Sequence, residues 1–181
     1  MNDFRLATDV RPRRYQLRFD LDLDGWCSAG TARIELVTGR AAKELVLHSC
    51  DLDIGTARLD GEPAIDISYD EDAQTATLEF ASEIAAGDHV LDVEWQGEIR
   101  AALRGLYRSV RGEERYAATQ FEAAAARRAF PCFDEPEFKA HFALELIHTS
   151  GLMAVGNMPI TSQADLGGGR TRTTFEETPI I

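Results

Sequence analysis

An amide and a carboxylate stand two residues apart in the segment Thr119-Gln120-Phe121-Glu122. If this segment ends a β-strand, the alternation of side chains places Gln120 and Glu122 on one face and turns Phe121 toward the core. A carboxylate beside an amide can bind a cationic amine that also has polar neighbours. The spacing by itself fits an ordinary solvated pair equally well, so the two residues are a candidate binding pair.

Four more charged residues follow closely: Arg127, Arg128, Asp134 and Glu135. The planar guanidinium group of arginine matches the geometry of a carboxylate. We therefore predict structural ion pairs that hold this loop, from either arginine to either acid, and we assign none of the four a catalytic role.

Complete catalytic motifs are absent from the sequence. It contains no G-x-S-x-G, no P-loop and no G-x-G-x-x-G, and its three cysteines form no C-x-x-C pair. The histidines form no H-E-x-x-H and are expected at surface or packing positions: His48, His89, His141 and His148. The sequence thus assigns no catalytic residue and no metal ligand to this chain.

The elements that must position these residues are strands, because the dominant hydrophobic period is two. In the segment 15–23 every second residue is apolar, which indicates a half-buried strand. Turn residues such as Asp24-Gly25 and Asp60-Gly61 separate further segments of this kind. Strands are predicted at 15–23, 31–37, 45–48, 64–69, 75–80, 91–95, 116–121, 142–148 and 171–175. This pattern predicts an all-β fold, an antiparallel β-sandwich.

One segment breaks the alternation. Residues 122–130 are rich in alanine and contain no β-branched residue, which predicts one short helix near 123–130 that ends before Pro131. A helix between strands of a sandwich must lie on its rim or across one of its faces.

The chain has 181 residues, enough for one domain with its own core, and a formal net charge of −12. Because such an acidic surface repels phosphate backbones, we predict no nucleic-acid partner. No run of eighteen apolar residues and no apolar leader is present, and the odd number of cysteines fits reduced thiols. We therefore predict no membrane partner and a cytoplasmic location.

Residues 119–140 resemble the T-Q-F-E…A-R-R-A-F-P-C-F-D-E-P…F-K-A signature of the aminopeptidase N family of zinc metallopeptidases, the gluzincin aminopeptidases. Ala123, Ala124 and Ala125 depart from it, since many members have P-T-D there; the missing acid removes a helix cap, at about 1 kcal/mol. Further matches follow in family order: Arg11-Pro12-Arg13-Arg14-Tyr15, Leu47-His48, Gly105-Leu106-Tyr107, Gly156-Asn157-Met158-Pro159 and Phe175-Glu176-Glu177-Thr178-Pro179.

The resemblance implies that the chain is the saddle-like amino-terminal domain of a zinc aminopeptidase, which hydrolyses amino-terminal residues from peptides. It implies that Glu122 binds the substrate α-ammonium and that Gln120 shapes the first subsite. The zinc would belong to the full-length parent and none to this chain, which alone would be inactive. The implied partners are peptide substrates, held by their free amino terminus, and the missing catalytic domain.

The resemblance further implies that residues 1–181 form one domain truncated before its last strand. An edge left open in this way would invite strand addition or dimerisation. Two alternatives stay open: a non-catalytic scaffold relative, and a stand-alone β-sandwich binding module. An exposed, coplanar Trp26 and Trp95 would favour the second.

Overall fold

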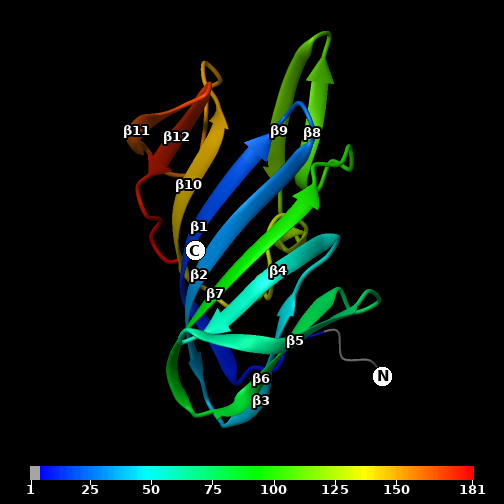
Figure 1. Ribbon diagram of the computed structural model, residues 1–181, viewed down its shortest axis with the longest axis vertical. Helices are drawn as coiled ribbons and strands as arrows, with labels where there is room; N and C mark the ends of the chain where they lie inside the picture. The colour runs from blue at the N-terminus through cyan, green and yellow to red at the C-terminus, as the bar shows by residue number, and fades with distance from the viewer. Residues whose placement is uncertain (1–4) are drawn as a thin grey trace.

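The computed structural model describes residues 5–181, which form strands and a single turn of 3-10 helix, η1 (Ala126–Arg128) (Figure 1). Within these residues, no helix has the length and apolar character needed to cross a membrane. The strands are β1 (Val10–Asp22), β2 (Cys27–Thr38), β3 (Ala42–His48), β4 (Leu52–Leu59), β5 (Glu62–Asp70), β6 (Thr75–Ile84), β7 (Gly87–Glu98), β8 (Gly105–Arg111), β9 (Glu114–Gln120), β10 (His141–Thr149), β11 (Ile160–Gly167) and β12 (Arg170–Phe175). The predicted all-β class is confirmed.

Ten of these strands form one sheet, in the order β11-β12-β10-β1-β2-β7-β4-β5-β6-β3, and β8 and β9 form a separate hairpin. The pairings are antiparallel with one exception: β1 and β10 run parallel, with Arg14 beside His141 and Asp20 beside Ile147. The large sheet is therefore mixed, where the sequence predicted only antiparallel pairs. The segment 121–140 carries the chain from the separate β8–β9 hairpin to the edge of β1, where β10 enters the sheet parallel to β1.

The large sheet bends at β4 and β5, which share only the residue pairs Arg58–Pro63 and Leu59–Glu62. Beyond the bend, β5, β6 and β3 form a second layer below the β1-β2-β7-β4 layer in Figure 1. Both layers contribute side chains to one core. Leu45 and Leu78 in the second layer and Ile34 in the first have no exposed surface. The two layers are those of the predicted sandwich, because each covers the apolar face of the other.

Each predicted strand overlaps an observed one, and β1 shows the reason. Tyr15, Leu17 and Phe19 are buried while Gln16 and Arg18, between them, are exposed. One face of the strand therefore supplies the core and the other meets solvent. The strands β4, β8 and β11 were not predicted.

The predicted helix near 123–130 is only the turn η1. Ala125 stands at its amino-terminal cap and makes no side-chain hydrogen bond there. A short, uncapped segment gains too few hydrogen bonds to offset the cost of nucleating an α-helix. The segment instead follows the shape of the sheet it covers, with Ala125, Ala129 and Phe130 buried against it.

Candidate functional site

Gln120 and Glu122 lie at the end of the β8–β9 hairpin, just before the crossing segment. Gln120 is the last residue of β9, and both side chains are exposed. Phe121, between them, is half-buried and packs edge-on against Phe130, with ring centres 6.1 Å apart. The side-chain oxygen of Gln120 accepts a hydrogen bond of 3.2 Å from the backbone N–H of Glu122, and the peptide bond after Glu122 is cis. The amide and the carboxylate are thus neighbours on the solvent side of the chain.

The hairpin that carries these residues is fastened to the first layer near the β1–β2 turn. The guanidinium groups of Arg108 and Arg115 lie over the Trp26 ring, 5.5 Å and 5.6 Å from its centre. The backbone N–H of Arg108 donates to the carbonyl of Arg100 at 3.0 Å. These contacts place the hairpin beside the sheet although β8 and β9 pair only with each other.

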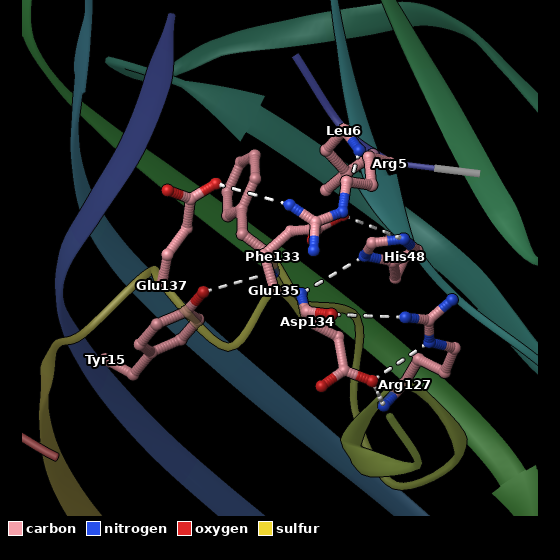
Figure 2. Close-up of polar contacts among 9 residues, drawn as sticks. All are labelled: Arg5, Leu6, Tyr15, His48, Arg127, Phe133, Asp134, Glu135 and Glu137. Atoms are coloured by element: carbon pink, nitrogen blue, oxygen red, sulfur yellow. Dashed lines mark hydrogen bonds and ion pairs between the residues drawn. The ribbon is translucent and has the colours of Figure 1, made fainter. Parts of the chain in front are cut away.

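The chain turns inward after Glu122 and buries an ion pair. The N–H of Ala125 donates to the carbonyl of Phe121 at 2.9 Å, which closes the turn. Two residues later Arg127 is buried, and its Nε lies 2.9 Å from Oδ2 of Asp134 (Figure 2). The Arg127 Nη2 atom donates to the backbone carbonyl of Asp134 at 3.2 Å, and its backbone N–H to Oδ2 at 3.4 Å. Asp134 therefore holds both the side chain and the backbone of η1.

The other two charged residues of the segment pair outside it. Arg128 contacts Asp51, with Nη1 2.6 Å from Oδ2, and Asp51 also binds Arg100 at 2.9 Å. Burial raises the pKa of Asp51, but the hydrogen bond and charge of Arg100, together with Arg128, outweigh it and lower that pKa. Glu135 accepts the backbone N–H of Leu6 at 2.9 Å. The charges predicted to pair within one loop thus join it to two distant parts of the chain.

A buried histidine connects this loop to the second layer. His48, at the end of β3, has no exposed surface and exchanges two backbone hydrogen bonds with Cys132, of 2.8 Å and 3.0 Å. Its ring Nδ1 accepts the N–H of Asp134 at 3.1 Å, and its Nε2 lies 4.0 Å from Oε1 of Glu135 (Figure 2). From residue types alone we expected a packing or surface histidine at position 48. The only sequence signal that distinguishes His48 from the other histidines is the Leu47-His48 match to the family pattern.

Tyr15 holds the same loop from the first layer. Its hydroxyl oxygen accepts the N–H of Phe133 at 3.1 Å, and its ring stacks on Phe142 with centres 4.8 Å apart. Burial raises the pKa of Tyr15 well above its usual value, so the hydroxyl stays protonated at neutral pH. Both layers of the sandwich therefore fix the loop through hydrogen bonds to its backbone.

An apolar cleft of about 340 Å³ opens next to Phe121. Phe130 and Phe142 form part of its wall, and Thr119 and Met158 border it. The cleft lies between β9 and β10, and Phe121 lines it whereas neither Gln120 nor Glu122 does.

The described residues do not fit a zinc site or an exposed sugar platform. Within residues 5–181 no three His, Cys, Asp or Glu side chains gather closely enough to hold a metal ion. Trp95 is only 3% exposed and donates its Nε1–H to the carbonyl of Ala129 at 3.1 Å, while Trp26 lies under two arginines. The two tryptophans therefore do not form the exposed coplanar pair that would have favoured a stand-alone binding module.

The chain is similar in sequence to known proteins. The family model of the peptidase M1 N-terminal domain matches residues 11–181. Aminopeptidase M1-C of rice is 39% identical over 98% of this chain, which covers 21% of that protein. The alanine/arginine aminopeptidase of Saccharomyces cerevisiae is 33% identical over 96% of this chain, which covers 21% of the yeast protein. Aminopeptidase N of Acetobacter pasteurianus is 33% identical over 97% of this chain, which covers 51% of that protein. The chain thus spans about a fifth of the first relatives it matches. The chain belongs to the M1 peptidase family, as the amino-terminal domain found in its aminopeptidases.

Proposed function

We propose that this domain holds the amino terminus of a peptide substrate for a zinc aminopeptidase. Glu122 binds the α-ammonium group, and Gln120 shapes the subsite for the first residue. The observation that carries the proposal is the exposed amide–carboxylate pair at the end of β9. The names of the relatives, which are aminopeptidases, support the same reading.

The chemistry of the pair suits an ammonium ligand. A carboxylate and an ammonium group form short, charge-assisted hydrogen bonds, which strengthen when water is excluded. Glu122 is exposed in this domain, so the exclusion of water would have to come from another part of the parent protein. Fixing the ammonium group sets the distance from the amino terminus to the bond that is cut, and accurate placement of this kind contributes strongly to rate. An enzyme built in this way removes one residue at a time.

The metal-dependent chemistry belongs, in this proposal, to the remainder of the parent. A bound zinc ion would polarise the scissile carbonyl and activate water there. The domain's own share is to bind and orient, so we expect the isolated domain to hold no zinc and to hydrolyse no peptide. Zinc analysis and an aminopeptidase assay on residues 1–181 test this, and activity from the domain alone would contradict it.

The assignment of Glu122 is tested in a full-length aminopeptidase that contains this domain. Glu122→Ala should lower kcat/KM on an aminoacyl-arylamide by the equivalent of roughly 2–5 kcal/mol, because it leaves the substrate ammonium without its counter-charge. Glu113→Ala is the matched control, since Glu113 is an exposed glutamate at the opposite end of the same hairpin. An unchanged kcat/KM in Glu122→Ala would overturn the assignment.

A further inference from the structure

On its β9 side the backbone of Glu122 is held by local contacts: its N–H donates to the side-chain oxygen of Gln120 at 3.2 Å, and Phe121 packs against Phe130. Glu122 lies beyond the last residue of β9, on a hairpin that pairs with no strand of the large sheet. The carboxylate of Glu122 is exposed, so no packing fixes it from the solvent side. A second constraint on its position acts through the chain that follows, the turn into η1.

That turn is held at its far end by Asp134. The Asp134 carboxylate accepts the Nε–H of Arg127 at 2.9 Å and its backbone N–H at 3.4 Å. Side-chain exposure is only 10% for Arg127 and 13% for Asp134, so this pair is held by its surroundings and is weakly screened by water. The backbone from Glu122 to Arg127 is thus pinned at one end by β9 and at the other by Asp134.

Asp134 is itself oriented by His48, which lies at the end of β3 in the second layer. His48 Nδ1 accepts the Asp134 N–H at 3.1 Å, and two backbone bonds hold His48 to Cys132. Because Nδ1 accepts a hydrogen bond, it carries no proton, and the proton on Nε2 faces Oε1 of Glu135 at 4.0 Å. The ring therefore holds the Asp134 backbone through Nδ1.

We infer that His48 and Asp134 are positioning residues for Glu122: His48 fixes the backbone of Asp134, and Asp134 fixes the turn that carries Glu122. The inference rests on the proposed function, because a positioning role for these residues has meaning only if Glu122 binds the substrate amine. Neither residue touches the substrate. Their effect is on where the Glu122 carboxylate stands relative to the incoming ammonium group, and a displacement of about 1 Å is enough to cost up to a hundredfold.

The test uses the full-length parent enzyme and two amide replacements of the histidine. In His48→Asn the amide oxygen can occupy the place of Nδ1 and accept the Asp134 N–H, whereas the oxygen of His48→Gln reaches the place of Nε2. Both variants lose the ring, and the smaller Asn leaves the larger cavity, so a loss confined to His48→Gln is not an effect of volume. They differ in whether Asp134 is still held.

The readout is the ratio of inhibition constants for alanine hydroxamate and for propanohydroxamate, which lacks the amine. The ratio reports the contribution of the ammonium group alone, so a lower content of folded enzyme does not change it. We expect His48→Gln to reduce the preference for the amine by about tenfold to a hundredfold. His48→Asn should keep most of it, and Leu59→Ala, a core change on β4 away from the loop, should leave it unchanged.

The outcomes separate the two proposals. If Glu122→Ala abolishes the preference for the amine but His48→Gln leaves it intact, the positioning role is wrong and the proposed function stands. If Glu122→Ala leaves the preference intact, the proposed function itself fails. Should His48→Gln not fold, Asp134→Asn decides, since it weakens the hold on Arg127 without altering shape; an unchanged ratio there would overturn the inference.

Discussion

The segment 119–135 has two halves that differ in solvent exposure: the first contains Gln120 and Glu122, and the second contains Arg127 and Asp134. Gln120 and Glu122 are exposed, and the hydrogen bond between them is local. Arg127, only five residues after Glu122, is 8% exposed and forms an ion pair with Asp134. The backbone N–H of Asp134 in turn donates to His48, on β3 of the second layer. Charged side chains in one short segment therefore meet two very different solvent environments.

The difference shows which charges can bind a ligand. A buried charge must be paired to offset its lost hydration, so the carboxylate of Asp134 is committed to Arg127. An exposed carboxylate keeps its hydration until a ligand replaces the water, so Glu122 remains available. The buried half should therefore govern stability, and the exposed half should govern binding.

The largest expected effect comes from breaking the buried pair. Arg127→Ala should lower the free energy of unfolding by about 3–5 kcal/mol, because it leaves Asp134 charged and poorly hydrated. The matched control is Arg33→Ala, whose pair with Asp92 is about as short, at 3.0 Å, but whose side chain is 52% exposed; about 0–1 kcal/mol is expected there. Urea denaturation of both variants measures the difference, and equal losses would refute the division by burial.

A smaller loss is expected when only a hydroxyl group is removed from the buried half. Tyr15→Phe leaves the Phe133 N–H without its acceptor in the core and should cost about 1–3 kcal/mol. Tyr116→Phe also removes one hydrogen bond, to Glu114, but on an exposed residue, and should stay within about 0.5 kcal/mol. The same denaturation experiment compares them, and a larger loss for the exposed tyrosine would reverse the comparison.

The pair of His89 and Asp60 is intermediate, with side-chain exposures of 11% and 50%. Burial lowers the pKa of His89, but its bonds to Asp60 and to the Ala85 carbonyl, with the charges of Asp60 and Asp88, outweigh this and raise that pKa. A group whose pKa is raised by folding stabilises the fold below its unfolded pKa, near 6.5, and loses that contribution as pH rises through the folded pKa.

The stability advantage of the unmodified chain over His89→Gln should therefore be largest below about pH 6.5 and shrink toward alkaline pH. Melting temperatures of both proteins between pH 5.5 and 9, an interval in which Asp60 stays ionised because its pKa is lowered, provide the measurement. A difference that grows with rising pH would show that the sign is wrong.

The smallest effect on stability is expected at the exposed pair. Gln120→Ala and Glu122→Ala should each change the free energy of unfolding by no more than about 0.5 kcal/mol, since neither side chain is packed. Differential scanning calorimetry of the two variants tests this. A loss comparable with that of Arg127→Ala would mean that the exposed half also supports the fold.

The strands missing from the sequence prediction share a physical cause: each lacks a regular buried face. On β4 the buried residues Leu52 and Ile54 fall out of phase with Ala57 and Leu59, because the pairing with β7 shifts between Ile54 and Thr56. Strand β11 lies at the sheet edge with nearly every side chain exposed, and β8 buries only its first two residues. In these three strands a bulge or an unpacked face removes the regular alternation that a packed face would impose.

The sequence by itself determined most of the strands and the side-by-side placement of Gln120 and Glu122, because alternation along an extended chain is a local property. The partners of Arg128 and Glu135 were decided only by the tertiary structure. Arg128 meets Asp51, 77 positions away, and Glu135 meets Leu6, 129 positions away. Such pairs depend on which strands the sheet brings together, and an arginine or a glutamate carries no local signal of its partner.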